Sequence, residues 1–260
     1  MKKLLVPMIL LLYSCRELPK EMPADTAKIA DSSRLMQASK PDTAQDQLYT
    51  SDLRPDRLVP LEKIFVDTVT YVDFSGDGDY MLCFIRKSSQ LLSLVCDNVP
   101  EGKLNFLRGD TLEIKWKMDS IWIAGEGERL DFAEWLTNVR KIKDGKVEAF
   151  RKSNPKPIKY WHAREKSYGE DFKDYLYRLV EYYIAYSEKE LVKAQLHNAE
   201  NNGFVYSIEE MEKNDRHYTV LGLSVDRGTH SNIIQWLYLD SETRLFYEYD
   251  PATDKLVEFK

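Results

Sequence analysis

Alternating runs of β-branched and aromatic residues, broken by Gly, Asp and Ser, recur through the first half of the chain. Such runs predict short strands. They cover residues 64–74, 80–86, 91–96, 111–117 and 120–124, with a tight turn at Met118-Asp119 between the last two. Short strands at this spacing predict a small twisted sheet or barrel, and both an OB-like and an SH3-like topology stay open.

A helical spacing follows these strands over residues 131–142. One face of such a helix would carry the apolar side chains Phe132, Trp135, Leu136 and Val139. Apolar residues three and four positions apart are the main signal of an amphipathic helix. We therefore expect one helix here, closing one side of the barrel.

The second half of the chain predicts helices followed by an antiparallel sheet. Between residues 168 and 201 a helical apolar face is formed by Phe172, Leu176, Leu179, Val180, Tyr183 and Ile184. Three tyrosines flank this face, suited to core packing or to an interface: Tyr175, Tyr182 and Tyr186. Strands joined by short polar turns then fill residues 204–259, so the fold class is α+β. The element order resembles that of a cystatin- or NTF2-like roll.

Two changes in composition divide the chain. Residues 16–60 carry five prolines and many small polar side chains, which is typical of a flexible linker. A second break, rich in turn residues, lies at Ser153–Pro157. We therefore predict a tether that ends at residue 60, a β-rich unit with one helix over 61–152, and an α+β unit over 158–260.

The N-terminus has the pattern of a cleaved signal peptide. Two lysines precede ten uncharged residues, which as a helix would reach only about 15 Å, half of a bilayer core. Leu12-Tyr13-Ser14-Cys15 resembles the lipobox of bacterial lipoproteins. The resemblance implies removal of residues 1–14, acylation of Cys15 and attachment to a membrane, whereas a plain secretory signal would leave Cys15 free. Because Arg16 rather than Asp follows the cysteine, the resemblance favours the outer membrane of the cell envelope over the inner one.

The composition, 43% apolar and 31% charged, is that of an ordinary globular protein. The net charge of −6 argues against nucleic acid as a partner, which would require a strongly basic surface. The run from Trp236 to Asp250, together with the signal and the lipobox, is similar to uncharacterised envelope lipoproteins of Bacteroidota. That resemblance implies a localisation and carries no catalytic motif.

A loop in the first half alternates acids as calcium-binding loops do. Asp73, Ser75, Asp77 and Asp79 match the spacing of EF-hand ligands, but Phe84 occupies the twelfth position, where a bidentate Glu is needed. The flanking segments are also predicted strands rather than helices. We therefore interpret the loop as a hairpin turn and predict neither a metal nor another cofactor.

The remaining thiols are Cys83 and Cys96. If the intervening turn centres on Ser89-Gln90, the two cysteines lie opposite each other on paired strands. An oxidising envelope would then permit a disulfide. Two separate thiols buried in a core are the alternative.

Motifs of known enzymes are missing from the sequence. There is no phosphate-binding loop, dinucleotide fingerprint, His-Glu-x-x-His or nucleophile elbow. Residues 226–231 gather an acid, a base and a hydroxyl, but catalytic triads assemble from separate segments, so we interpret them as a polar hairpin loop. We predict that the protein is not an enzyme.

Aromatic residues are the one unusual feature of the composition. Trp236, Tyr238, Tyr247 and Tyr249 lie on two strands that we expect to pair. We expect one pair to pack beneath the helices and the other to be exposed as a binding surface. The sequence thus predicts a non-catalytic envelope lipoprotein that binds a protein partner, for example as an inhibitor or immunity-type protein. A glycan- or small-ligand-binding lipoprotein is the alternative, and an enzyme without a recognisable motif comes third.

Overall fold

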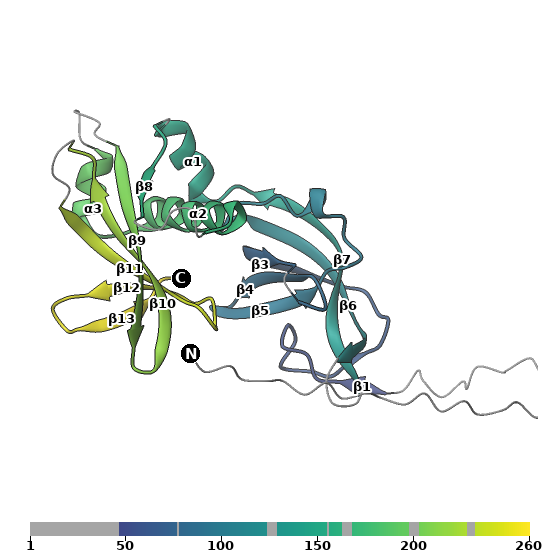
Figure 1. Ribbon diagram of the computed structural model, residues 1–260. Coiled ribbons are helices and arrows are strands. Elements are labelled where there is room, and N and C mark those ends of the chain that lie inside the picture. The colour runs from purple at the N-terminus through teal and green to yellow at the C-terminus, as the bar shows by residue number, and fades with distance from the viewer. Residues whose placement is uncertain are drawn as a thin grey trace, which may run out of the picture. The chain divides into compact units, whose positions relative to one another are not determined.

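The alternating segments of the first half form a closed five-stranded barrel (Figure 1). This computed structural model describes residues 47–76, 78–123, 129–154, 156–162, 168–197, 203–227 and 232–260. The barrel strands are β3 (Phe65–Ser75), β4 (Leu82–Lys87), β5 (Gln90–Val95), β6 (Thr111–Ile123) and β7 (Arg129–Lys143). Their order is β3-β4-β5-β7-β6, with β5 and β7 parallel and the other pairs antiparallel. This is the Greek-key arrangement of an OB-fold, so the first of the two expected topologies is the observed one.

The barrel core forms because alternate side chains of each strand point inward. Fully or almost fully buried members of this core are Cys83, Ile85, Leu94, Leu112, Ile114, Trp116 and Leu136. The turn expected at Met118-Asp119 is absent, and β6 runs through it without a break. Met118 is only 2% exposed, and its carbonyl accepts a hydrogen bond from the amide of Glu62 at 3.0 Å. Both contacts stabilise the extended conformation of β6 at this position.

The helix predicted over residues 131–142 is wrong, because this segment is strand β7, paired with β6 along its length. A β-bulge explains the misleading spacing. The register with β6 shifts beside Lys115 and Trp116, so that Leu136 and Val139 both point into the barrel although they are three positions apart. A three-residue spacing that normally indicates a helix is produced here by an extra residue in a strand.

The chain before the barrel is packed against it from residue 47 onward. Two short strands, β1 (Leu48–Tyr49) and β2 (Val59–Pro60), pair with each other, and Leu53 is 2% exposed. Asp67 on β3 accepts hydrogen bonds from Arg54 at 2.9 Å and from Lys87 at 2.8 Å. Residues 47–60, which we call the strap, are therefore part of the fold, and they do not belong to the tether that was predicted to reach residue 60.

The second half has the predicted order of helices and then an antiparallel sheet, so the protein is α+β. The helices are α1 (Lys146–Ser153), α2 (Glu170–Tyr186) and α3 (Glu190–Leu196). The sheet order is β13-β12-β11-β10-β9-β8, from β8 (Lys159–Trp161), β9 (Phe204–Lys213), β10 (Arg216–Val225), β11 (Ile233–Asp240), β12 (Phe246–Asp250) and β13 (Lys255–Glu258). Strand β8, which the sequence did not predict, pairs in parallel with β9.

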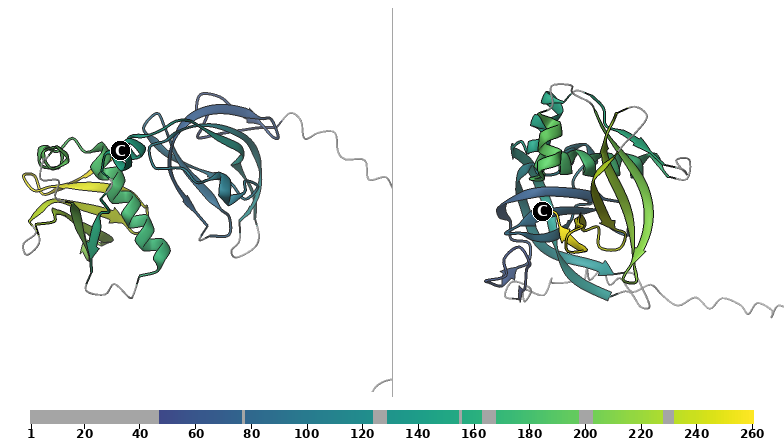
Figure 2. Two further views of the ribbon diagram at one scale, coloured as in Figure 1. Left: turned by 90° about the horizontal axis from the view of Figure 1, so that it is seen from above. Right: turned by 90° about the vertical axis from the view of Figure 1, so that its left-hand side faces the viewer.

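The two faces of this sheet carry different clusters of side chains. One face packs against α2 through residues such as Tyr206, Leu221, Leu237 and Phe246. The opposite face holds a smaller cluster of Tyr218, Val220, Tyr238 and their neighbours. The strands curve strongly around this second cluster (Figure 2, right), and Lys213 of β9 forms an ion pair with Asp254, between β12 and β13, at 2.8 Å.

The barrel and the α+β half meet at α1 and α2. The hydroxyl of Tyr186 at the end of α2 accepts a hydrogen bond from the amide of Lys146 in α1 at 3.0 Å and donates one to the carbonyl of Gly109, in the loop before β6, at 3.4 Å. Residues 43–260 form one compact unit, so the predicted division into two folding units near residue 153 stays a prediction. Across the described ranges, no helix is both long and apolar enough to span a membrane.

Candidate ligand-binding pocket

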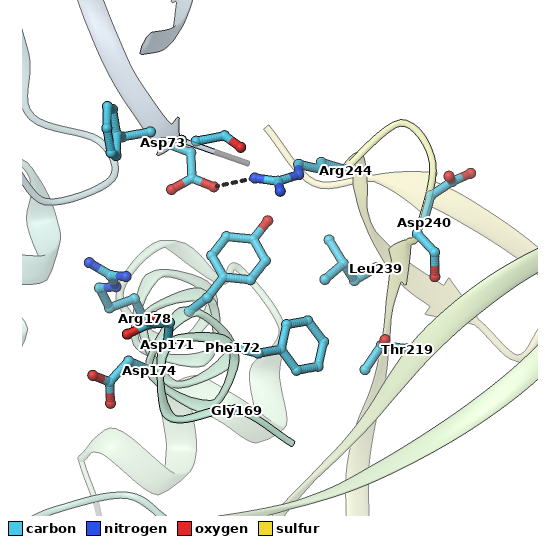
Figure 3. Close-up of a pocket in the computed structure, with 15 residues that line it drawn as sticks. Asp73, Gly169, Asp171, Phe172, Asp174, Arg178, Thr219, Leu239, Asp240 and Arg244 are labelled. Atoms are coloured by element: carbon cyan, nitrogen blue, oxygen red, sulfur yellow. Dashed lines mark ion pairs between the residues drawn. The ribbon is translucent and has the colours of Figure 1, made fainter. Parts of the chain in front are cut away.

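A cavity of about 620 Å³ lies where three parts of the chain converge (Figure 3). Its walls are the end of β3, the first turns of α2, and strands β10 and β11 with the turn that follows β11. We call it the Asp73 pocket, after the carboxylate at its inner end. The volume is in the range of sites that enclose small molecules.

Each wall follows from the local fold. β3 ends at Ser75, so Asp73 and Phe74 lead into the β3–β4 loop. Helix α2 turns its apolar stripe to the sheet, which leaves Phe172 and Tyr175 at the edge of that stripe facing the cavity. In OB-folds this first loop is one of the segments that bind oligonucleotides or oligosaccharides, and here it is a wall of the pocket.

The floor of the pocket comes from the sheet. Leu239 and Thr219 are 4% and 8% exposed, and they present a methyl-rich surface with one hydroxyl. Figure 3 shows Phe172 directed toward these two residues. The floor is therefore mostly apolar, and the charged groups lie around it.

Asp73 is the acid of the pocket that has a buried oxygen without a hydrogen-bond donor. Its side chain is 16% exposed, and no described residue donates a hydrogen bond to its Oδ2 atom. Burial raises the pKa of Asp73, while the nearby guanidinium groups of Arg108, Arg244 and Arg178 act in the opposite direction. A buried carboxylate oxygen without a donor is costly, so a bound donor would be stabilising.

Three arginines surround this carboxylate. Arg244 approaches Asp73 Oδ2 at 4.0 Å, too long for a hydrogen bond, and lies over the ring of Tyr175 at 6.0 Å. Arg108 donates to the carbonyl of Val72 and lies over the ring of Tyr182 at 5.5 Å. Arg178 is exposed on α2 and forms no ion pair with any residue in the described ranges.

The other acids of the pocket differ in their availability. Asp240 already accepts hydrogen bonds from the amides of Glu242 and Thr243 and from the guanidinium group of Arg216. These donors hold the pKa of Asp240 below its usual value although burial raises it. Asp171 and Asp174 are exposed on α2 at the rim. Only Asp73 is both deep and incompletely partnered.

The four aromatic residues predicted to bind a partner lie elsewhere. Trp236, Tyr238, Tyr247 and Tyr249 all share the sheet face opposite α2, because Tyr238 pairs directly with Tyr247. The expected division into an inward and an outward pair is therefore wrong. Tyr238 is only 6% exposed, and the other three are half-buried within the curled sheet. Their role in binding stays a prediction.

The two cysteines of the barrel are buried free thiols. The hairpin centres on Ser88 and Ser89, since Lys87 pairs with Gln90, so Cys83 pairs with Leu94 rather than with Cys96. The cysteines are diagonal neighbours instead of opposite each other, which removes the geometric reason for expecting a disulfide between them. Burial raises the pKa of both thiols to about 12, which makes them unreactive at neutral pH.

Several other sequence predictions cannot be followed into the structure. Cys15 lies outside the described residues, as do Asp77 of the acidic loop and residues 228–231 of the polar hairpin loop. Within the described ranges, no group of three or more His, Cys, Asp or Glu side chains is arranged to hold a metal ion. The absence of a metal or other cofactor stays a prediction.

One cluster brings together residues that looked scattered in the sequence. The hydroxyl of Tyr168 donates to Glu210 at 2.9 Å and lies 3.2 Å from Nε2 of His162. Tyr168 lies just before α2, Glu210 is on β9, and His162 follows the last residue of β8. None of the three lines the Asp73 pocket, but the ring of Tyr168 contacts that of Phe172, which does, with the ring centroids 5.5 Å apart.

The sequence contained two partial signals of the pocket. The acidic loop drew attention to Asp73, and the tyrosines flanking the helical face included Tyr175. The contributions of Arg178 and Arg244 had no local signal, because they reach Asp73 only through the packing of segments about 100 and 170 positions further along the chain.

Comparisons with known proteins identify no family. No protein-family model matches the chain, and no curated protein matches it. The mitochondrial single-stranded DNA-binding protein Rim1 from S. cerevisiae is 9% identical, with a TM-score of 0.24, and the match covers 32% of this chain and 96% of that one. An aspartyl tRNA synthetase from Entamoeba histolytica is 12% identical, with a TM-score of 0.28, over 80% of this chain and 57% of that one. A murine DNA-binding protein bound with double-stranded DNA is 9% identical, with a TM-score of 0.18, over 75% of this chain and 92% of that one.

These neighbours correct one expectation. We excluded nucleic acid as a partner because the chain is acidic, yet the structural neighbours include proteins that bind single-stranded and double-stranded DNA. Net charge averages over the whole surface, whereas binding depends on the charge of one face. The exclusion is therefore withdrawn, and the likeness itself is too remote to indicate what this chain binds.

Proposed function

We propose that this protein is a lipid-anchored, non-catalytic binding module of the bacterial cell envelope, and that the Asp73 pocket is its ligand site. The pocket favours the small-ligand or glycan alternative over a protein partner as the first function. The observation that carries the proposal is the buried oxygen of the Asp73 carboxylate, which lines a 620 Å³ cavity and has no hydrogen-bond donor, only a long ion pair with Arg244 at 4.0 Å. Sites for small molecules combine an apolar lining with a few convergent polar groups in this way.

The membrane part of the proposal depends on the N-terminus. The lipobox-like Leu12–Cys15 sequence after a short apolar segment supports acylation of Cys15 and an outer-membrane location. A non-catalytic role is supported by the lack of a second deep, available acid or base beside Asp73 among the described residues of the pocket. The helix α2 lying on a curled antiparallel sheet also supports the finer proposal of a cystatin- or NTF2-like roll.

The pocket is tested with a variant that fills its mouth. Ser241 is exposed and lines the cavity, so Ser241→Trp should obstruct it without disturbing the core. Ser120→Trp places the same side chain at an exposed site on β6, away from the cavity, and is the control. We expect saturation-transfer NMR of the full chain in detergent, with small molecules and oligosaccharides extracted from the envelope, to give signals that only Ser241→Trp abolishes. Signals that survive in both variants, or no signals in the wild type, would contradict the proposal.

A protein partner remains the second candidate because of one apolar surface. Trp122, Ile123 and Leu130, at the end of the β6–β7 hairpin, are 56%, 41% and 48% exposed. Exposed Trp is enriched at interfaces and often dominates their binding energy. An inhibitor or immunity-type protein would use such a surface, and Trp122→Ala should then remove a specific protein from an envelope pull-down while leaving the melting temperature unchanged.

A further inference from the structure

We infer that the end of the β6–β7 hairpin rests on the phospholipid surface to which an acylated Cys15 would attach the chain. Trp122 and Leu130, which we call the hairpin patch, make the contact. This inference goes beyond the Asp73 pocket and rests on the proposed acylation of Cys15. It follows from where the patch lies on the barrel, from where the N-terminal chain enters the fold, and from the chemistry of the patch.

The hairpin patch continues the inward face of the barrel past the barrel's end. β3 pairs with β6 only as far as Trp116, whereas β6 pairs with β7 up to Ile123. Trp122 pairs with Leu130, and the two-residue period of a strand directs both to the side on which Met118 fills the core. Trp122 and Leu130 are nevertheless 56% and 48% exposed. They form an apolar face that most of the described chain leaves uncovered.

The N-terminal chain enters the fold beside this patch. The described residues begin at position 47, and the ring of Tyr49 on β1 packs against that of Phe132, with the centroids 4.1 Å apart. Phe132 is two positions from Leu130 on β7 and therefore shares its face. Figure 1 shows β1 beside the end of β6. The strap thus covers this face as far as Phe132, and the uncovered hairpin patch lies next to the place where the chain from Cys15 arrives.

The length of the tether makes a weak contact sufficient. About 30 residues separate Cys15 from the strap, and their composition predicts a flexible linker. A flexible tether of that size holds a domain near its anchor at an effective concentration on the order of millimolar. A lipid contact too weak to bring the free protein to a membrane is therefore occupied in the anchored one.

The chemistry of the patch fits the boundary between headgroups and acyl chains. Trp is enriched at this boundary, and apolar side chains bind there in proportion to the area that they bury. The charged groups of the hairpin, Arg129 and Asp131, pair with each other at 2.9 Å on the opposite face. Because the net charge of the chain is −6, anionic lipids offer no attraction, and the contact depends on apolar burial.

The surroundings of the patch set the depth of the contact and favour lipid over protein. The sequence between the two strands carries Glu126 and Glu128, and carboxylates are costly in hydrocarbon, so we expect a shallow contact. A standard protein interface takes about 20–30 residues from each side. The hairpin patch consists of two large side chains bordered by the exposed polar residue Ser120, which is small for such an interface.

Brominated lipids report which tryptophan touches the bilayer. The full chain, purified from membranes in detergent, would be reconstituted into phosphatidylcholine vesicles whose acyl chains are either plain or brominated near the headgroup. The protein has five tryptophans, so we expect brominated lipid to quench about one fifth of the fluorescence. Trp122→Phe should abolish this quenching. Trp161→Phe, which removes a 64% exposed indole from β8, is the control and should retain it.

A second pair of variants changes the contact and keeps the reporter. Leu130→Glu places a carboxylate beside Trp122 and should reduce the quenching by at least about half, because a charge is costly to bring to hydrocarbon. Asn138→Glu adds the same charge at an exposed site further along β7 and should leave the quenching unchanged. Both positions are exposed, so the thermal melts of both variants should coincide with that of the wild type.

Pelleting of the same vesicles separates this inference from the proposed anchor. A chain that pellets without quenching, or whose quenching survives in Trp122→Phe or Leu130→Glu, overturns the inference and leaves the acylation of Cys15 supported. A chain that does not pellet overturns both. Loss of one envelope protein from a pull-down with Trp122→Ala, with no quenching in the vesicles, would assign the patch to a protein partner and overturn the inference.

Discussion

Replacing Gly145 with alanine should destabilise the fold by about 1–3 kcal/mol, the usual cost of overpacking. Gly145 precedes α1, and a Cβ atom built there would lie 2.7 Å from both the carbonyl carbon and the oxygen of Gly109. Ordinary van der Waals contact begins near 3.4 Å. Because the obstacle is backbone, no side-chain rotation relieves it, and the loop before β6 has to move away from α1.

The backbone conformation of Gly145 makes this a clean test. Its φ of −77° is open to any residue, so the substitution adds no dihedral strain. Gly102→Ala is the matched control, because a Cβ there meets nothing within 4 Å. Alanine at such a site should be neutral or stabilise by about 0.4–1 kcal/mol through the unfolded chain.

Urea denaturation followed by tryptophan fluorescence measures both variants. Thermal melts should agree, with a shift of about 2–4 °C per kcal/mol for a chain of this size. The hydroxyl of Tyr186 is also close to the new Cβ, at 2.9 Å. Adding Tyr186→Phe to Gly145→Ala should restore little stability. Equal midpoints for Gly145→Ala and Gly102→Ala, or full restoration by Tyr186→Phe, would refute the reasoning.

Three further predictions concern single side chains. Asp67→Ala should cost about 3–5 kcal/mol in urea denaturation, because it leaves three donors without their acceptor, whereas Glu113→Ala, in an exposed ion pair, should change little. Burial raises the pKa of Asp67, but its hydrogen-bond donors lower the pKa to below the ordinary 3.8. The stabilisation by Asp67 is therefore present above pH 3.8 and is lost as the pH falls through the pKa of the folded state. Equal loss of stability in acid for the wild type and for Asp67→Ala would contradict this. Cys15→Ala should move the protein from the membrane pellet to the soluble fraction, and unchanged pelleting in carbonate would exclude acylation. Native alkylation of Cys83 and Cys96 by iodoacetamide at pH 7 should be slow, since burial raises the pKa of both to about 12, and should become fast in urea; rapid labelling of the folded protein would contradict their burial.

The order of elements was largely predictable because most segments carry a clean local pattern. Residues 64–74 alternate as β3 does, and the helical face from Phe172 to Ile184 matches α2. The segment at 131–142 failed because its decisive contacts are with β6 and β5, and the bulge gave Leu136 and Val139 a helical spacing. A single sequence shows the spacing of side chains, but it does not show which partner strand will pair with them.

The candidate site was less predictable, for a related reason. Asp73 and Tyr175 were noticed for other purposes, as a possible calcium ligand and as part of an aromatic stripe. Neither pattern indicated that β3 would end against α2, or that the turn carrying Arg244 would close the cavity. The aromatic residues around Tyr238 were noticed for their composition, yet they mainly fill the inside of a curled sheet.

The strap and the pocket are connected by a single strand. Asp67, which binds the strap through Arg54, and Asp73, at the inner end of the pocket, both belong to β3. If the chain is anchored through Cys15, a pull from the membrane enters the described part of the fold at the strap, which is bonded to the barrel at Asp67 and Lys87. If the roughly 30 residues between Cys15 and the strap are the flexible linker that their composition predicts, their r.m.s. reach is roughly 30 Å. Because Asp67 and Asp73 are on the same strand, a force on the N-terminal chain would act on the strand that forms one wall of the pocket.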